Sequence, residues 1–192
     1  MSVRTAADRG REVRLQLLNT AAELIAELGW NAVSTRILAE RAGVTPGLVH
    51  YHFPSLQALL RDAALGMISD LLSATELIFE DARALGTGVD RMLDSLAAYP
   101  GRDSPSLLFI ETCLAATRDE TLRVELLGLT DEFRRRLARW LGEHGASTPH
   151  DTASVLAAAI NGVMIHRALN PELTSSAVAS VLRRLVTSLP KP

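Results

Sequence analysis

The sequence lacks features that several classes of protein require. It contains one cysteine, Cys113, in 192 residues, which excludes an internal disulfide and a zinc site built on several cysteines. Phe, Trp and Tyr make up only 4% of the chain, whereas apolar residues make up 47%. Most of these are Leu and Ala, which favour helices over strands. The composition therefore predicts an all-α protein with a sizeable core.

Lysine and long apolar runs are also scarce. The single lysine is Lys191, and the net charge of −2 does not by itself indicate a nucleic-acid-binding protein. No uninterrupted apolar run reaches the roughly 18 residues of a membrane-spanning helix, and the chain does not open with a signal-sequence pattern. We therefore expect a cytoplasmic protein with no membrane partner.

The apolar periodicity and the end signals predict nine helices. Leu17, Leu24 and Ile25 recur at helical spacing before Gly29, a residue type that commonly ends a helix. The first ten residues are expected to fray, and Arg4, Arg9, Arg11 and Arg14 are expected to be mobile positive charge. The other helices are expected at about 35–41, 46–52, 56–84, 89–99, 104–117, 120–144 and 149–169, and from 174 or 175 onward.

Two short helices flank a glycine-containing turn at residues 34–53. Ser34 is a good N-cap for the first helix, and Gly43 suits the left-handed turn that ends it. Thr45 and Pro46 are typical of the N-cap and first helical position of the next helix. This is the helix-turn-helix pattern, whose second helix reads the major groove of DNA.

This segment resembles the TetR family of bacterial repressors. The resemblance lies in the spacing of Ala42-Gly43-Val44, Gly47 and Tyr51-His52-Phe53 within STRILAERAGVTPGLVHYHFPSLQALL at 34–60. It covers about residues 12–62, and the length and helix count of the chain also match that family. It implies a three-helix DNA-binding domain at 1–54 and a helical body at 55–192 that binds a small-molecule effector and dimerises.

The resemblance also implies which residues face a DNA operator. They are Ser34, Thr35, Arg36, Thr45, Pro46, Gly47, Leu48, His50, Tyr51 and His52. The sequence departs from the family pattern twice, because His50 replaces a usual Tyr and Leu56 replaces a frequent phosphate-contacting Lys. The implied function is that of a repressor that binds a palindromic operator as a homodimer.

A repressor that responds to an effector needs a cavity whose affinity for that molecule differs between two states. Glu111 shares a helix face with Leu107, Leu108 and Leu114, and burial of a carboxylate is costly without a partner. It is either an acid of the cavity or the partner of an arginine such as Arg118, Arg123 or Arg167. The candidate wall residues, which also fit an ordinary core, are Met67, Phe79, Met92, Phe109, Glu111, Cys113, Trp140 and His166.

The helix expected at 149–169 is apolar nearly all round between residues 153 and 166, a pattern typical of a helix that is buried on several sides. In the resembling family the last two helices pair with their copies, and a twofold dimer presents two recognition helices about 34–36 Å apart. The alternative is a monomeric bundle centred on this helix. The candidate interface residues are Ala153, Ala157, Ala158, Gly162, Val178, Val181, Leu182 and Leu185.

Other functions remain as alternatives. An enzyme would have to use Cys113, His166 and Glu111, but a cysteine within an apolar helix is usually inert. The sequence has no glycine-rich phosphate loop and no metal-spaced pair of ligands, so we predict no catalytic residue, metal or cofactor. An activator with the same architecture, or a helical adaptor without an effector, fits the same pattern.

Overall fold

The computed structural model describes residues 5–80, 82, 84–95, 99–170, 172–173 and 175–187. Within these ranges it contains helices and no strand, which confirms the all-α prediction. The α-helices are α1 (Ala6–Leu28), α2 (Thr35–Arg41), α3 (Pro46–His52), α4 (Leu56–Glu80), α5 (Leu85–Ser95), α6 (Ser104–Ala116), α7 (Glu120–Glu143), α8 (Pro149–Leu169) and α9 (Ser175–Thr187). A short 3₁₀ turn, η1 (Trp30–Ala32), follows α1.

Two helices begin earlier than the sequence predicted. The Thr5 hydroxyl accepts a hydrogen bond from the Asp8 N–H (3.1 Å), and the Asp8 carboxylate accepts one from the Thr5 N–H (3.0 Å). This capping box starts α1 at Ala6, within the segment that was expected to fray. Gly86 and Gly88 were expected to precede the fifth helix, yet both lie inside the first turns of α5.

Close packing against Trp140 explains why residue 88, inside α5, is a glycine. A Cβ atom at this position would lie 2.3 Å from the Trp140 ring, so only glycine lets the indole pack against α5. The residue that reads as a helix breaker in the sequence is therefore required by packing between α5 and α7.

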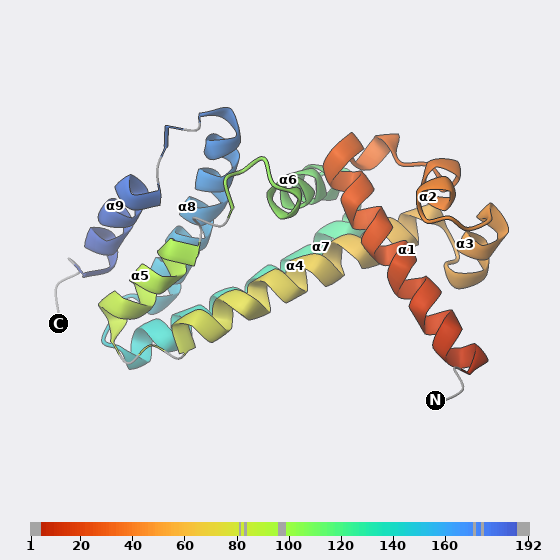
Figure 1. Cartoon of the computed structure of the whole chain (residues 1–192). Coiled ribbons are helices and arrows are strands. Elements are labelled where there is room, and N and C mark those ends of the chain that lie inside the picture. Colours follow the sequence, from red (N-terminus) through yellow and green to blue (C-terminus); the bar gives the residue numbers. More distant parts are fainter. Residues whose placement is uncertain are drawn as a thin grey trace.

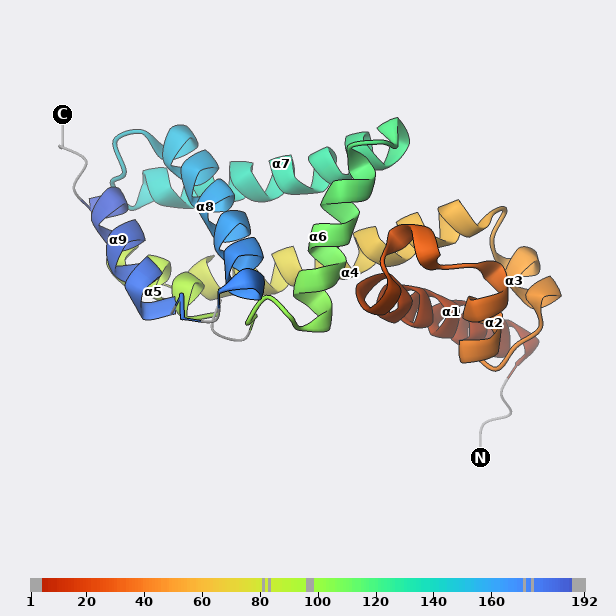
Figure 2. The ribbon, with the colours of Figure 1, turned by 90° about the horizontal axis from the view of Figure 1, so that it is seen from above.

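The helices form an elongated molecule with α1, α2 and α3 at one end and α5, α8 and α9 at the other (Figure 1). The long helices α4 and α7 pack side by side and connect the two ends. Helix α6 lies between the three N-terminal helices and the pair formed by α7 and α8 (Figure 2), and it packs against α1, α4, α7 and α8.

Two apolar cores stabilise this arrangement. The first joins the N-terminal helices to the body, since Leu24 and Ile25 of α1 belong to the same cluster as Leu108 of α6 and Leu122 of α7. The second lies at the far end of the molecule, where Phe79, Phe133 and Trp140 stack edge to face or tilted. Because the first core is continuous, α1 and α6 cannot shift independently without loss of packing.

Helix α8 is the one described helix with the length and apolar composition to cross a membrane, properties that it shares with core helices of soluble proteins. Polar residues interrupt its apolar run, so the sequence contains no uninterrupted apolar run of membrane-spanning length at this position. Only 22% of its most apolar window is buried within the subunit, so the helix leaves much of its apolar surface exposed.

We predict that Gly101→Ala destabilises the fold more than Gly145→Ala. The two glycines have φ of 88° and 89°, so each alanine incurs the left-handed penalty of about 1–2 kcal/mol. A Cβ at Gly101 would also lie 2.5 Å from the Ala168 nitrogen and 2.6 Å from the Met164 oxygen. At Gly145 nothing lies within 4 Å. We expect Gly101→Ala to lower the free energy of unfolding by about 2–4 kcal/mol in total.

Urea unfolding of both variants at one protein concentration measures this difference. Equal losses in the free energy of unfolding would mean that the close approach of the loop before α6 to the backbone of α8 does not constrain the residue at position 101.

Candidate nucleic-acid interface and internal cavity

Helix α3 is held rigidly at its start and along one face. The Thr45 hydroxyl accepts a hydrogen bond from the Leu48 N–H (3.4 Å), and Pro46 occupies the first turn. Val49 and Phe53 are buried in the first core. The preceding helix is capped in the same way, because the Ser34 hydroxyl accepts from the Ile37 N–H (3.3 Å). The opposite face of α3 is therefore free to meet a partner.

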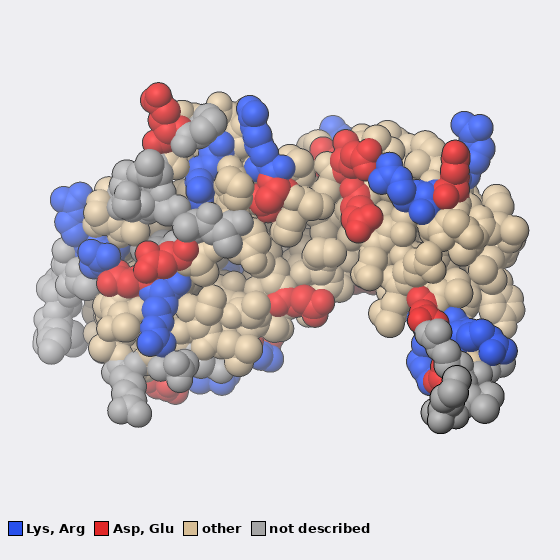
Figure 3. Space-filling view, viewed as in Figure 1, with Lys and Arg blue, Asp and Glu red and all other residues tan. Residues whose placement is uncertain are grey.

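The predicted DNA-facing residues divide by exposure. Thr45, Pro46, Gly47, His50, Tyr51 and Arg36 are exposed, and Ser34, Thr35, Leu48 and His52 are half-buried. Tyr51 is 82% exposed, which is unusual for an aromatic ring unless it serves binding. Most of the surface over α3 on the face shown in Figure 3 is uncharged. This surface is suited to hydroxyl, ring and shape contacts more than to ion pairs.

His52 lies further from the exposed face than the sequence suggested. Its ring packs edge-on against Tyr51 with 5.1 Å between centroids, and its Cε1 atom lies 4.0 Å from the position of a Cβ built on Gly10 of α1. Its carbonyl oxygen accepts a hydrogen bond from Arg14 (3.1 Å). These contacts give His52 a part in joining α3 to α1, and its contact with DNA stays a prediction.

Arg14 is a structural residue that the sequence reading missed. It was expected to be mobile positive charge, but its guanidinium pairs with Asp62 of α4 (2.8 Å) and lies 4.1 Å from the centroid of the Phe53 ring. With its bond to the His52 carbonyl, it links α1, the end of α3 and α4. The spacing of these residues along the chain gave no local signal of this contact.

Two further features lower the charge near α3. Leu56, at the position where the family often has a lysine, packs against the first core. Arg41 of α2 pairs with Glu27 through two hydrogen bonds (2.8 and 3.2 Å), which hold the pKa of the Glu27 carboxyl below its ordinary value. Arg36 makes no ion pair within the described part of the chain, so its charge remains available.

The body contains a cavity of about 410 Å³ between α4, α5, α6, α7 and α8. Three of the predicted wall residues, Met92, Phe109 and Cys113, line it. Desolvation raises the pKa of the Cys113 thiol to about 11, so the thiol is protonated at neutral pH and unreactive. The size falls within the range of small-molecule sites. Among the described residues, no group of three or more His, Cys, Asp or Glu is placed to hold a metal ion.

The other predicted wall residues lie elsewhere. Met67 packs against the first core, and Phe79 and Trp140 are buried in the second. His166 is exposed on α8. Apolar side chains at helical spacing face whichever helix lies opposite, and the sequence did not indicate which neighbours leave a space between them.

Glu111 does not line the cavity, which corrects the prediction of a cavity acid. Its Oε2 atom accepts a hydrogen bond from the backbone N–H of Trp30 (3.0 Å) and lies 3.3 Å from a Cβ built on Gly29. Phe109 and Cys113 face the cavity, so α6 presents the cavity on one side and the turn after α1 on another. The partner of Glu111 is a backbone amide, and neither an effector nor an arginine is needed to account for its burial.

The predicted interface residues lie in three environments. Ala153 and Leu182 are buried inside the subunit, Val178 packs against the second core, and Ala157 and Ala158 line the cavity. The side chain of Leu185 lies outside the described residues. Ala158, Gly162 and Val181 lie at least partly on the surface.

Three further apolar residues of α8 are exposed, and they were not among the predicted interface residues. Val155, Ile165 and Leu169 are 55%, 45% and 75% exposed. With Ala158 and Gly162 they recur every three or four residues, and we call this row the α8 stripe. Because the buried face of α8 is apolar as well, the spacing of apolar residues in the sequence does not separate the two faces.

Two family models match the chain. One is described as bacterial regulatory proteins of the tetR family and matches residues 17–63. The other is described as a tetracyclin repressor-like C-terminal domain and matches residues 80–188, more than half of the chain.

Individual relatives are similar over different lengths. The HTH-type transcriptional repressor KstR2 of Rhodococcus jostii is 36% identical over 67 residues, which cover 35% of this chain and 32% of that protein, so the match spans about a third of this relative. The HTH-type transcriptional regulator BetI of Vibrio vulnificus is 27% identical over 83% of this chain and 82% of its own length.

A solved structure, that of the transcriptional regulator SCO7518 from Streptomyces coelicolor A3(2), superposes with a TM-score of 0.72. It is 29% identical and covers 92% of this chain and 99% of its own. The helix-turn-helix geometry, the helical body and these matches agree, and the chain therefore belongs to the TetR family of DNA-binding transcription regulators.

Proposed function

We propose that the chain is an effector-responsive repressor that binds a palindromic operator as a homodimer in the cytoplasm. Residues 1–54 would form the DNA-binding unit, and residues 55–192 the effector-binding and dimerisation unit. The observation that carries the proposal is the exposed face of α3, where Tyr51 is 82% exposed while Val49 and Phe53 of the same segment are buried. The buried residues fix the helix, and the exposed ones are left to meet base edges and phosphates.

The α8 stripe supports the homodimer. Its residues leave an apolar row on a helix that is otherwise packed against α7, and small residues at 158 and 162 allow another backbone to approach closely. Val181, which is 48% exposed on α9, extends the apolar surface. Solvent-exposed apolar surface of this extent favours association with a copy of itself.

The response to an effector is supported by the two faces of α6. A ligand in the cavity touches Phe109 and Cys113 on one side of this helix. On another side, Glu111 accepts a hydrogen bond from the amide of Trp30, the first residue of the 3₁₀ turn between α1 and α2. A small displacement of α6 would therefore change the position of the turn that supports α2 and α3. Such a displacement requires a ligand that binds the two positions with different affinity.

The operator prediction is tested by selection of bound sequences from a random pool of DNA. We expect a palindrome whose half-sites are one helical turn apart, or a multiple of it. Tyr51→Ala should weaken binding to the selected site by about 1–3 kcal/mol, which is about fivefold to 150-fold, without a change in thermal unfolding. Leu77→Ala, at a residue 69% exposed on α4, is the control. A pool with no enriched motif would refute the DNA-binding proposal.

The dimer prediction is tested by sedimentation at micromolar concentration. We expect the wild-type chain to sediment as a dimer and Ile165→Arg as a monomer, because a charge at the centre of an apolar interface loses its hydration. Val124→Arg, an equivalent change at a residue 56% exposed on α7, should leave the dimer intact. A monomeric wild-type chain, or equal effects of the two arginines, would contradict this assignment of the interface.

The connection through Glu111 is tested by its truncation. Glu111→Ala leaves the Trp30 N–H without its acceptor, and we expect a loss of about 1–2 kcal/mol in the free energy of unfolding. Faster hydrogen exchange should appear at the Trp30 amide. Glu111→Gln, whose amide oxygen can still accept, should have a smaller effect, and Glu143→Ala at the exposed end of α7 should have none. Unchanged exchange at Trp30 would mean that this contact does not hold the turn.

A further inference from the structure

We propose that the cavity of the body binds an amphipathic anion, with its apolar part among the cavity walls and its anionic group on Arg134. This inference rests on the proposed effector response and names the chemical class of the effector. Three features of the described residues carry it: the composition of the walls, the lack of a carboxylate among the described residues that line the cavity, and the position of Arg134 at a polar opening.

The walls of the cavity are mainly apolar. Leu72 of α4, Phe109 of α6 and Met164 of α8 contribute to it from three sides. On α7 the apolar lining residues run from Leu126 to Phe133, a span of about 10 Å at 1.5 Å per residue. An apolar chain or ring system of this length would bury its surface here, which is the main source of affinity in such sites.

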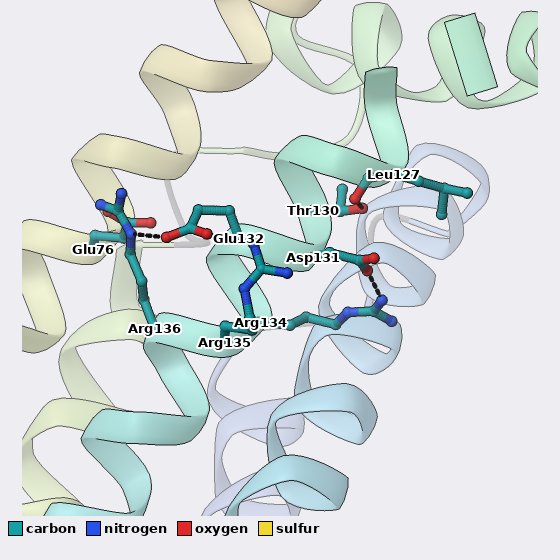
Figure 4. Close-up of polar contacts among 8 residues, drawn as sticks. All are labelled: Glu76, Leu127, Thr130, Asp131, Glu132, Arg134, Arg135 and Arg136. Carbon is teal, nitrogen blue, oxygen red and sulfur yellow. Dashed lines mark hydrogen bonds and ion pairs between the residues drawn. The ribbon is translucent and has the colours of Figure 1, made fainter. Parts of the chain in front are cut away.

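No aspartate or glutamate lines the cavity among the described residues. Several acids adjoin lining residues in sequence, and three of them, Glu125, Asp131 and Glu132, pair with arginines. Glu76 and Glu111 are directed elsewhere. Glu76 follows the lining residue Thr75, but its Oε2 atom accepts a hydrogen bond from Arg136 (2.7 Å), as Figure 4 shows on the side of α7 that faces α4. Glu111 accepts from the Trp30 amide. A cationic ligand would therefore lose its hydration without a countercharge in the cavity.

Arg134 lies where the apolar cavity meets a smaller polar pocket of about 270 Å³. Arg134 and Ser154 line both spaces, and Asp131, Arg135 and His150 line the polar one. Figure 4 shows the Arg134 side chain extending from α7 toward α8, away from the Glu76–Arg136 pair. Arg135 pairs with Glu132, so the guanidinium group that lies between the two spaces and can reach a ligand is that of Arg134.

The contacts of Arg134 leave donors for a ligand. One terminal nitrogen donates to Asp131, one turn earlier on the same helix, and a guanidinium carries five N–H groups. Its side chain is 41% exposed, so an anion there keeps part of its hydration while its apolar part enters the cavity. Charge-assisted hydrogen bonds to carboxylate or phosphate are well suited to this geometry.

Arg123, the other arginine that lines the cavity, is less suited to the role. Its Nε and Nη2 atoms both donate to Glu120, so its planar donor face is already occupied by a carboxylate. It lies eleven residues from Arg134 on α7, about 16 Å along the helix axis. The anionic group is therefore assigned to the Arg134 end.

Calorimetric titration of the full-length protein with four probes of equal chain length tests this inference. Decanoate and decyl phosphate carry an anion, decanol is neutral, and decyltrimethylammonium is a cation, each used below its micelle concentration. We expect both anions, or one of them, to bind at least about tenfold more tightly than the cation. The ratio of decanoate to decyl phosphate affinity distinguishes a carboxylate ligand from a phosphate ligand.

Arg134→Ala should lower the affinity for the preferred anion about tenfold and change that for decanol less than twofold. Arg134→Lys should restore part of the preference, since it keeps the charge but not the planar donors. Arg139→Ala, at an exposed position further along α7, is the matched control and should bind like wild type. Thermal unfolding checks that each variant is folded.

Tighter binding of the cation, binding of none of the four probes, or an anion preference that survives Arg134→Ala would each overturn the inference. These outcomes are separate from the proposed DNA-binding function, because the titrations contain no DNA. If the chain selects a palindromic operator but prefers the cation, the assignment of the effector class fails while the regulator proposal stands.

Discussion

The placement of α3 depends on how α1 is held, because α1 is the helix of the N-terminal unit that packs on both α4 and α6. The apolar part of this contact is the first core, in which Leu24 and Ile25 lie among residues of α6 and α7. Polar contacts fix its ends. Arg14 joins the N-terminal half of α1 to Asp62 and to the carbonyl of His52, and Glu111 holds the amide of Trp30 just after its last turn. The exposed face of α3 is thus positioned by residues that lie outside α3, with the exception of the His52 carbonyl.

Few positive charges are available near the exposed face of α3, the side proposed to meet DNA. Arg14 and Arg41 are both engaged in ion pairs within the subunit, and Leu56 is packed in the core. Exposed pairs of this kind contribute little to stability, typically below about 1 kcal/mol, but they remove positive charge that could otherwise attract any DNA. In the proposed complex with DNA, a surface with Arg36, Thr45 and Tyr51 among its polar groups would rely on fit to base edges and groove shape, which depend on sequence more than phosphate contacts do.

The extent to which the sequence predicts the structure depends on whether the signal is local. The caps formed by Ser34, Thr45 and Asp119 were predictable, because a capping side chain and its amide partner lie within one turn. The same holds for the helix-turn-helix spacing. Contacts between distant segments carry no such signal, and Glu111 illustrates this: its helix face was read correctly as partly buried, but its partner lies 81 residues away. Gly88 was misread for the same reason, since its close contact with Trp140 comes from another helix.

Helix α8 shows why a helix that is apolar all round is hard to interpret from its sequence. Its residues face three environments at once: Ala153 and Leu156 are buried in the second core, Ala157 and Met164 line the cavity, and Val155 and Leu169 are exposed. All are apolar, so the periodicity that separates core from solvent in an ordinary amphipathic helix is absent. In the proposed dimer, this arrangement places the cavity and the subunit interface on adjacent faces of one rigid element. A ligand that displaces α8 would then also alter the relation between the two subunits, and with it the distance between their α3 helices, on which binding to a palindrome depends.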